Sequence, residues 1–106
     1  MPDPVDSLVD SLMESMTALI EVLRLHDEPF WAKWMSDDMR AVDRGDARAL
    51  DHILAAYGGM GSVNDLILDR ISGRILTGDE RVAANENLRA LLSRVYDLAR
   101  SLRREV

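Results

Sequence analysis

Apolar residues recur along the chain at the three- and four-residue spacing of amphipathic helices. The pattern predicts a first helix over residues 5–26, with Pro4 in the first turn, where proline is tolerated. A second long pattern predicts a last helix over residues 79–104, and Thr77 and Glu80 have the spacing of a capping box at its start. The apolar face of the first helix consists of Val5, Leu8, Val9, Leu12, Met13, Met16, Leu19, Ile20 and Leu23.

Two shorter helices are predicted between these long ones. The second helix covers residues 29–44, starts at Pro29 and ends at Gly45, and its apolar stripe consists of Trp31, Trp34, Met35 and Val42. Asp46 is placed to cap a third helix over residues 47–57, whose apolar face consists of Leu50, Ile53, Leu54 and Tyr57. Connections this short make successive helices antiparallel neighbours.

A glycine-rich stretch, Tyr57-Gly58-Gly59-Met60-Gly61-Ser62-Val63-Asn64-Asp65, follows the third helix. Glycines so close together end a helix and permit backbone conformations with positive φ, and we expect them to pack closely under the tryptophans. Ser62 is expected to cap a short helical turn with Asp65 at capping-box spacing. Residues 66–77 fit either a short helix or a hairpin that turns at Ser72-Gly73. Because an isolated hairpin is marginal, a short helix followed by an irregular, hairpin-like connection is favoured.

The predicted fold is therefore all-α. It is an antiparallel four-helix bundle-like domain with a short irregular insertion, a helical turn or a hairpin, before the last helix. The 106 residues form one helical domain, residues 1–106, and their apolar content of 47% is enough for a core without covalent staples. The absence of cysteine excludes disulfides and thiolate chemistry.

Charge is distributed unevenly along the chain. Residues 1–46 hold 11 acidic and 4 basic side chains, a net −7, whereas residues 47–106 hold 8 and 9, a net +1. An acidic protein of this kind lacks the basic face that nucleic acid requires, so no nucleic-acid partner is expected. The imbalance fits a partner with a basic surface, or no charged partner at all.

Acidic residues gather on one flank of the first helix, namely Asp6, Asp10, Glu14 and Glu21. We expect them to meet Arg103, Arg100, Tyr96 and Arg89 of the last helix across an antiparallel seam, in exposed pairs that set register more than stability. The flank is otherwise a solvated surface, or the contact surface for a basic partner.

Asp38 falls within the apolar stripe of the second helix, whereas its neighbour Asp37 points away. A carboxylate on a core-facing position must be paired, hydrogen-bonded or neutralised. We predict that Asp38 is ionised and accepts hydrogen bonds from the glycine loop, from an indole, or from Ser62 or Asn64. Two or three such donors would lower its pKa.

The sequence offers little catalytic chemistry. His26 is expected in the last turn of the first helix, where a positive charge is favourable. His52 is expected to be solvent-exposed and to face away from Asp38. No pair of histidines at metal-ligand spacing is present, no base is evident for Ser62, and the glycine loop lacks the lysine of a phosphate-binding loop. No catalytic residue, metal or cofactor is predicted, and enzyme activity is not favoured.

The segments Phe30-Trp31-x-x-Trp34-Met35-x-x-Asp38, Gly45-Asp46 and Ala56 to Leu66 together resemble an uncharacterised family of small bacterial helical proteins. In that family a tryptophan-rich helix is followed by a glycine loop of the form YGGMGSxND. The resemblance covers residues 30–68 closely and implies no substrate. It draws attention to a binding or structural motif formed by Trp31, Trp34, Asp38, Tyr57, Gly58, Gly59, Gly61, Ser62, Asn64 and Asp65.

Two functions are compatible with these patterns. The first is a non-catalytic protein that binds a basic partner, as an immunity protein or antitoxin does. The second is a small sensor or adaptor that binds a ligand, or a copy of itself, through its tryptophan helix and glycine loop. A cytoplasmic location without a membrane partner is expected, because no apolar run approaches ~18 residues and the start lacks the basic residues of a signal peptide.

Overall fold

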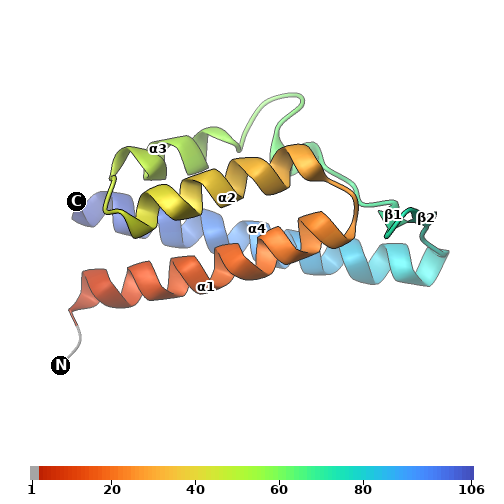
Figure 1. The fold of residues 1–106 in the computed structure, drawn as a ribbon, viewed down its shortest axis with the longest axis horizontal. Coiled ribbons are helices and arrows are strands. Elements are labelled where there is room, and N and C mark those ends of the chain that lie inside the picture. The colour runs from red at the N-terminus through yellow and green to blue at the C-terminus, as the bar shows by residue number, and fades with distance from the viewer. Residues whose placement is uncertain (1–2) are drawn as a thin grey trace.

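The computed structural model describes residues 3–106, and four helices account for most of them (Figure 1). They are α1 (Pro4–Leu25), α2 (Pro29–Asp43), α3 (Arg48–Ala55) and α4 (Gly78–Glu105). A 3₁₀ turn, η1 (Val63–Asp65), and two short strands, β1 (Arg70–Ile71) and β2 (Arg74–Ile75), lie between α3 and α4. The predicted fold, four helices with a short irregular insertion before the last, is confirmed.

Local signals in the sequence determine the helix ends. At the start of α1, Asp3 Oδ1 accepts a hydrogen bond from the Val5 amide at 2.7 Å. The capping box predicted at the start of α4 is present, with Thr77 and Glu80 each accepting from the other's amide. Gly45, with φ of +79°, turns the chain between α2 and α3.

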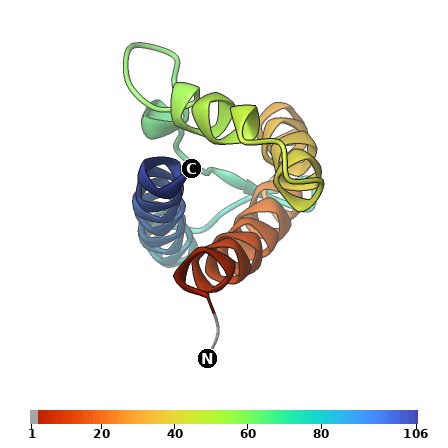
Figure 2. The same ribbon diagram turned by 90° about the vertical axis from the view of Figure 1, so that its left-hand side faces the viewer.

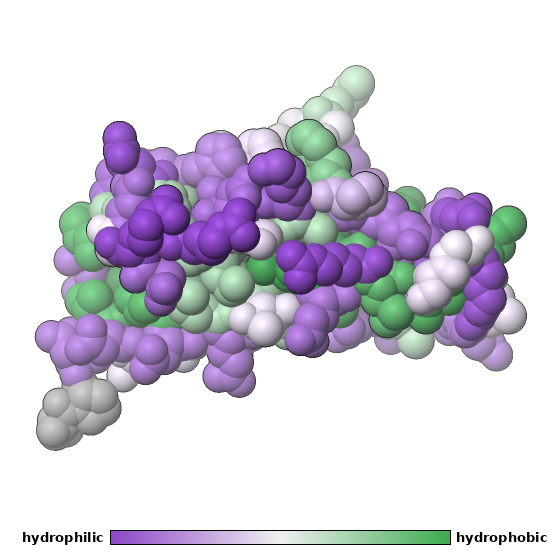
Figure 3. All heavy atoms as spheres, viewed as in Figure 1, coloured by the Kyte–Doolittle hydropathy of each residue, from purple (hydrophilic) through white to green (hydrophobic). Residues whose placement is uncertain are grey.

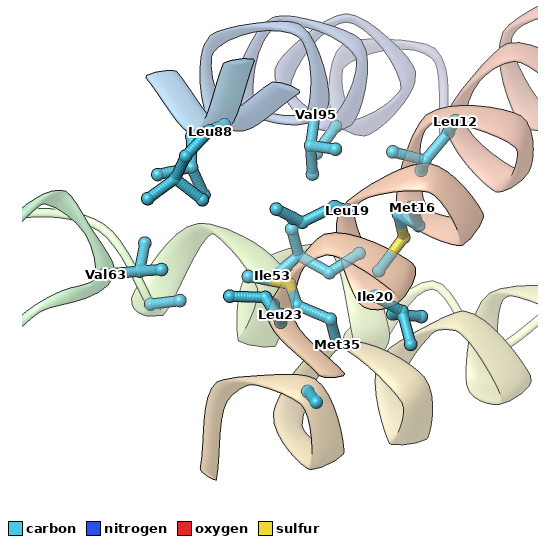
Figure 4. Packing of buried hydrophobic residues seen from close by; sticks show 14 of the residues in the cluster. Leu12, Met16, Leu19, Ile20, Leu23, Met35, Ile53, Val63, Leu88 and Val95 are labelled. Atoms are coloured by element: carbon cyan, nitrogen blue, oxygen red, sulfur yellow. The ribbon is translucent and has the colours of Figure 1, made fainter. Parts of the chain in front are cut away.

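The helices follow one another around the bundle (Figure 2). α1 packs against both α2 and α4, and α3 bridges α2 and α4 on the opposite side. Apolar side chains from all four helices and from the connection meet in the interior (Figure 4). The fully buried members are Leu12, Met16, Leu19, Leu23, Met35, Ile53, Val63, Leu68, Leu88 and Val95. Burying side chains of this size stabilises the fold by about 1.5–3 kcal/mol each.

The connection before α4 differs from the favoured prediction, because residues 66–69 form no helix and Leu66 has extended backbone angles, with φ of −66° and ψ of 130°. β1 and β2 then pair antiparallel, with Arg70 opposite Ile75. Ser72 and Gly73 form the turn with φ of +46° and +84°, the positive values typical of a two-residue hairpin loop. The hairpin alternative, which the sequence analysis placed second, is therefore correct for residues 70–75.

Tertiary contacts explain why so short a hairpin forms. The corner between α1 and α2 lies against it, and the Ser72 amide donates to the Leu25 carbonyl at 2.9 Å. His26 Nδ1 donates to the Arg70 carbonyl at 2.7 Å, since a carbonyl can only accept. His26 thus ends α1, as predicted, but it is buried and bonded to the hairpin.

Helix α4 holds the extended segment in place. The Asn85 side chain accepts from the Leu68 amide at 2.8 Å and donates to the Leu68 carbonyl at 2.9 Å. The Arg89 guanidinium donates to the carbonyls of Asn64 and Leu66. These side chains satisfy backbone groups that a helix would otherwise have paired internally.

The predicted pairing of charges between α1 and α4 is wrong. Arg103 binds Asp51 of α3 at 2.9 Å, and Arg100 lies over the ring of Tyr96. None of the ion pairs formed within residues 3–106 involves the acidic flank of α1, which comprises Asp6, Asp10, Glu14 and Glu21. In this part of the chain, no helix is long and apolar enough to cross a membrane.

Candidate functional site

A buried acid–histidine pair joins α2 to α3. The Asp38 side chain lies on the core face of α2, as the sequence predicts, and Asp38 is only 5% exposed. Its carboxylate oxygens lie 2.7 and 2.8 Å from Nδ1 of His52, which therefore donates to it. The predicted partners, in the glycine loop or an indole, are wrong.

His52 is held in place from two directions. Its ring stacks on the ring of Trp34, with centroids 4.1 Å apart and an interplanar angle of 14°. The Trp34 indole N–H in turn donates to the His52 carbonyl at 3.2 Å. The His52 side chain is 53% exposed, as predicted, but the expectation that it faces away from Asp38 is wrong.

Burial dominates the electrostatics of this pair. Desolvation raises the pKa of the Asp38 carboxyl, and the hydrogen bond from His52 offsets only part of that effect. The lowered pKa predicted from the sequence requires two or three donors, and it is wrong. A single side-chain donor does not compensate for the loss of water around a buried carboxylate.

An Asp–His pair is part of many hydrolytic sites, in which the acid orients an imidazole that activates a nucleophile. Within residues 3–106, no nucleophile is hydrogen-bonded to the remaining ring nitrogen of His52. Among the same residues, no group of three or more His, Asp or Glu side chains is arranged to hold a metal ion. The arrangement pins α3 against α2 and keeps Trp34 between them.

The glycine loop, residues 57–62, projects from the molecule beside α3 (Figures 1 and 3). Gly58, Gly59 and Gly61 have φ of +87°, +82° and +76°, so the predicted positive φ values are confirmed. A Cβ at any of them would meet nothing within 4 Å. The expected close packing under the tryptophans is therefore wrong, and backbone conformation alone explains these glycines.

The residues that follow the loop take different roles from those predicted. Ser62 precedes η1 without capping it, and its hydroxyl is buried with no hydrogen-bond partner among the described residues. Asp65 Oδ2 accepts from the Gly61 amide at 2.9 Å and so closes the loop on itself. Met60, at the tip of the loop, is 98% exposed.

An open groove of about 530 Å³ lies between α3 and α4, at the base of this loop; we call it the tyrosine groove. Tyr57 lines this groove, and its hydroxyl donates to the Leu92 carbonyl at 2.8 Å. The rings of Tyr57 and Tyr96 lie 4.9 Å apart. The lining residues are Leu54, Tyr57, Gly58, Asn64, Arg89, Leu92, Ser93, Tyr96 and Arg100.

The electrostatics of the tyrosine groove combine a neutral interior with a cationic edge. Burial, with a smaller contribution from Asp97, raises the pKa of Tyr57, so its hydroxyl stays protonated and remains a donor. The Arg100 guanidinium lies 5.7 Å from the Tyr96 ring centroid, within the range of a cation–π interaction.

The residues singled out from the sequence thus lie in two regions, one on the α2 side and one on the α4 side of α3. Trp34 and Asp38 lie on the α2 side, together with Trp31. The ring centroids of Trp31 and Trp34 are 5.3 Å apart. Tyr57, Gly58 and Asn64 line the tyrosine groove on the α4 side. The main residues that the sequence analysis did not assign to a site are His52, Arg89, Leu92, Tyr96 and Arg100.

One signal could have revealed His52 as the partner of Asp38. The two residues are each seven positions from Gly45, at the turn of an antiparallel helical hairpin. Residues equidistant from such a turn lie at the same height on adjacent helices. Tyr96 and Arg100 were placed on one flank of the last helix, but nothing in the sequence assigned that flank to α3.

The fold and these two regions define a small antiparallel helical-bundle protein with a glycine loop between its third and fourth helices. The chain belongs to the family described as "Domain of unknown function (DUF6966)", whose profile matches residues 24–77. The tryptophan-bearing part of α2 and the glycine loop both lie within the matched residues. Searches of the curated proteins and of the solved structures returned no match.

Proposed function

We propose that this protein acts without catalysis by binding a basic protein partner, in the manner of an immunity protein or antitoxin. The observation that supports this function is the acidic flank of α1. Its four carboxylates are exposed and take part in none of the ion pairs within residues 3–106, as noted above. The lower edge of the molecule in Figure 3, formed by α1, carries a hydrophilic band.

The spacing of the flank suits an extended contact. Asp6 and Glu21 are fifteen positions apart in one helix, which corresponds to about 22 Å along its axis at the α-helical rise. Like charges at four-residue spacing repel one another by a few tenths of a kcal/mol per pair, and a basic partner would relieve that repulsion. Such a flank also accelerates encounter with a basic partner by electrostatic steering.

The same charge argues against other partners. A second copy of the chain carries the same acidic flank, so self-association through α1 is disfavoured. Nucleic acid and anionic membrane surfaces are repelled in the same way. In this proposal the protein works in the bacterial cytoplasm, and Asp38 and His52 have a structural role.

The experiment is affinity capture from the native host with three versions of the protein. One is the wild type, and one is the flank variant Asp6→Asn/Asp10→Asn/Glu14→Gln. The control variant, Asp79→Asn/Glu86→Gln/Asp97→Asn, removes the same charge from α4. Wild type and control are expected to capture one stoichiometric basic protein, which the flank variant does not.

Salt provides the second arm of this experiment. Capture by the wild type is expected to be lost near 1 M salt, where the Debye length falls to about 3 Å. A partner that the flank variant retains, or a partner that is not basic, would contradict the proposal.

The alternative of a sensor that combines the tryptophan helix with the glycine loop receives less support. Helix α3 lies between α2 and the tyrosine groove, so Trp34 and Gly58 do not face a common space. The glycine loop lines the tyrosine groove through Tyr57 and Gly58.

A further inference from the structure

We infer that the tyrosine groove is a binding site for a small aromatic carboxylate, a planar apolar body that carries one anionic group. The inference goes beyond the proposed interaction through α1, and neither depends on the other. It is based on the shape of the groove, its aromatic lining and the two arginines at its edge.

The tyrosine groove has the size and enclosure of a small-molecule site. Three elements enclose the groove: the C-terminal end of α3, the glycine loop, and the middle of α4. Its volume of about 530 Å³ falls within the range of small-molecule sites, roughly 300–1,000 Å³. The groove is open because α3 ends at Ala55 and the chain leaves as a loop, while α4 continues past it.

The aromatic lining favours a planar ligand. The Tyr57 ring is fixed by the hydrogen bond from its hydroxyl to the Leu92 carbonyl. The centroid of the Tyr96 ring lies 4.9 Å from that of Tyr57, and the interplanar angle is 59°. Leu54 and Leu92 add apolar surface. An aromatic ring placed here would pack against one tyrosine face and the edge of the other, the geometry that such rings prefer.

The arginines provide the anion-binding part. Arg100 forms no ion pair within residues 3–106, and its guanidinium lies beside the Tyr96 ring. Arg89 donates to two backbone carbonyls, which leaves N–H groups free and its charge unopposed by a carboxylate. Guanidinium groups bind carboxylates through paired hydrogen bonds, so a carboxylate is the anion that best matches this edge.

Two acidic groups lie near the groove but do not line it. Asp97, whose charge contributes to the raised pKa of Tyr57, lines the neighbouring hollow on α4 with Arg94. Asp65 is hydrogen-bonded to the Gly61 amide. A phosphate-rich ligand is disfavoured, because the groove contains neither a lysine nor the N-terminus of a helix. The Arg100 guanidinium beside two tyrosines fits a single carboxylate on an aromatic ring.

The test uses 2-naphthoate as the probe and amide NMR spectra of the full chain as the readout. Saturable shifts are expected at Gly58, Asn64, Ser93 and Tyr96, which surround the groove. The neutral analogue 2-naphthylmethanol is expected to bind about tenfold more weakly or worse, because it lacks the charged hydrogen bonds to arginine. Shifts that cluster elsewhere, or equal affinity for the neutral analogue, would overturn the inference.

Matched variants distinguish binding in the groove from nonspecific binding elsewhere on the protein. Arg100→Gln is expected to weaken 2-naphthoate binding about tenfold, whereas Arg104→Gln, on the same helix but outside the groove, leaves it unchanged. Tyr96→Phe keeps the ring and should retain binding, while Tyr96→Ala should lose it. The flank variant of α1 is expected to bind the probe like wild type. An Arg100→Gln protein with a wild-type helical spectrum and unchanged affinity would refute the site.

Discussion

The two sides of α3 contrast in how completely their polar groups are satisfied. On the α2 side, Asp38, His52 and Trp34 bond to or stack on one another. On the α4 side, the Tyr57 hydroxyl is bonded, but Arg100 has no carboxylate partner within residues 3–106 and the space beside it is open. A short helix thus has one face with a structural role and one face available for binding.

Side-chain size at the two contacts accounts for the difference. The α2 side presents an indole ring that covers His52 and occupies the seam. On the α4 side, the small side chain of Ser93 lines the groove, and α3 ends at Ala55 before it can cover the rest of α4. A closed seam stabilises the fold, whereas an open one leaves room for a ligand.

The largest effect is expected from Ile53→Ala, because Ile53 anchors α3 in the core and so supports both sides. Truncating a fully buried isoleucine should lower the free energy of unfolding by about 2–5 kcal/mol. Urea denaturation followed by tryptophan fluorescence measures this, with Ile67→Ala, at a 63% exposed position, as the control. A loss below about 1 kcal/mol would mean that α3 is not anchored through this residue.

Asp38→Ala tests only the α2 side of α3. The substitution leaves the His52 N–H without its acceptor and leaves a space where the carboxylate was. It should lower the free energy of unfolding by about 1–3 kcal/mol. Asp38→Asn should cost less, because its carbonyl oxygen still accepts from Nδ1. The neighbouring Asp37, which pairs with Lys33 and Arg40 on the surface, provides the control, and Asp37→Ala should cost clearly less than Asp38→Ala. Equal melting of Asp38→Ala and wild type would remove the structural role assigned to this pair.

Tyr57→Phe tests the hydrogen bond that fixes Tyr57 on the α4 side of α3. Loss of the hydrogen bond to the Leu92 carbonyl should lower the free energy of unfolding by about 0.5–1.5 kcal/mol. Tyr96→Phe is the matched control, since within residues 3–106 its hydroxyl forms no hydrogen bond, and it should change stability by less than about 0.5 kcal/mol. If both substitutions cost the same in chemical denaturation, Tyr57 is not the fixed wall of the groove.

The smallest effect is expected from pH, because burial and the His52 hydrogen bond act on Asp38 in opposite directions. Burial prevails and raises the pKa of Asp38 above its ordinary value of 3.8, so the folded protein holds this proton more tightly than the unfolded chain does. The resulting stabilisation is fully present below pH 3.8 and is lost as the pH rises through the folded pKa.

Urea titrations of wild type and Asp38→Asn across this window measure that contribution. The difference in their free energies of unfolding, wild type minus variant, is expected to fall as the pH rises. A difference that grows with pH would instead indicate that the ion pair with His52 outweighs burial. Groups such as Glu80, whose pKa is lowered to about 2, titrate in both proteins and cancel in the comparison.

Sequence alone determined the features that arise from local interactions. Apolar periodicity located the four helices, the Thr77–Glu80 spacing located the start of α4, and the glycines indicated a loop with positive φ. The burial of Asp38 followed from its place on a helical face. Each of these depends on residues within a few positions of one another, whose preferences the chain carries with it.

Only the tertiary structure decided which distant groups meet. Asp38 is bonded to His52 and not to the glycine loop, because the α2–α3 hairpin brings the histidine within 3 Å. The hairpin at residues 70–75 forms because the α1–α2 corner bonds to its backbone, while α4 holds the preceding segment through Leu68. Arg100 faces Tyr96 and not the acids of α1, since rotation of a helix about its axis depends on core packing, which outweighs weak exposed ion pairs.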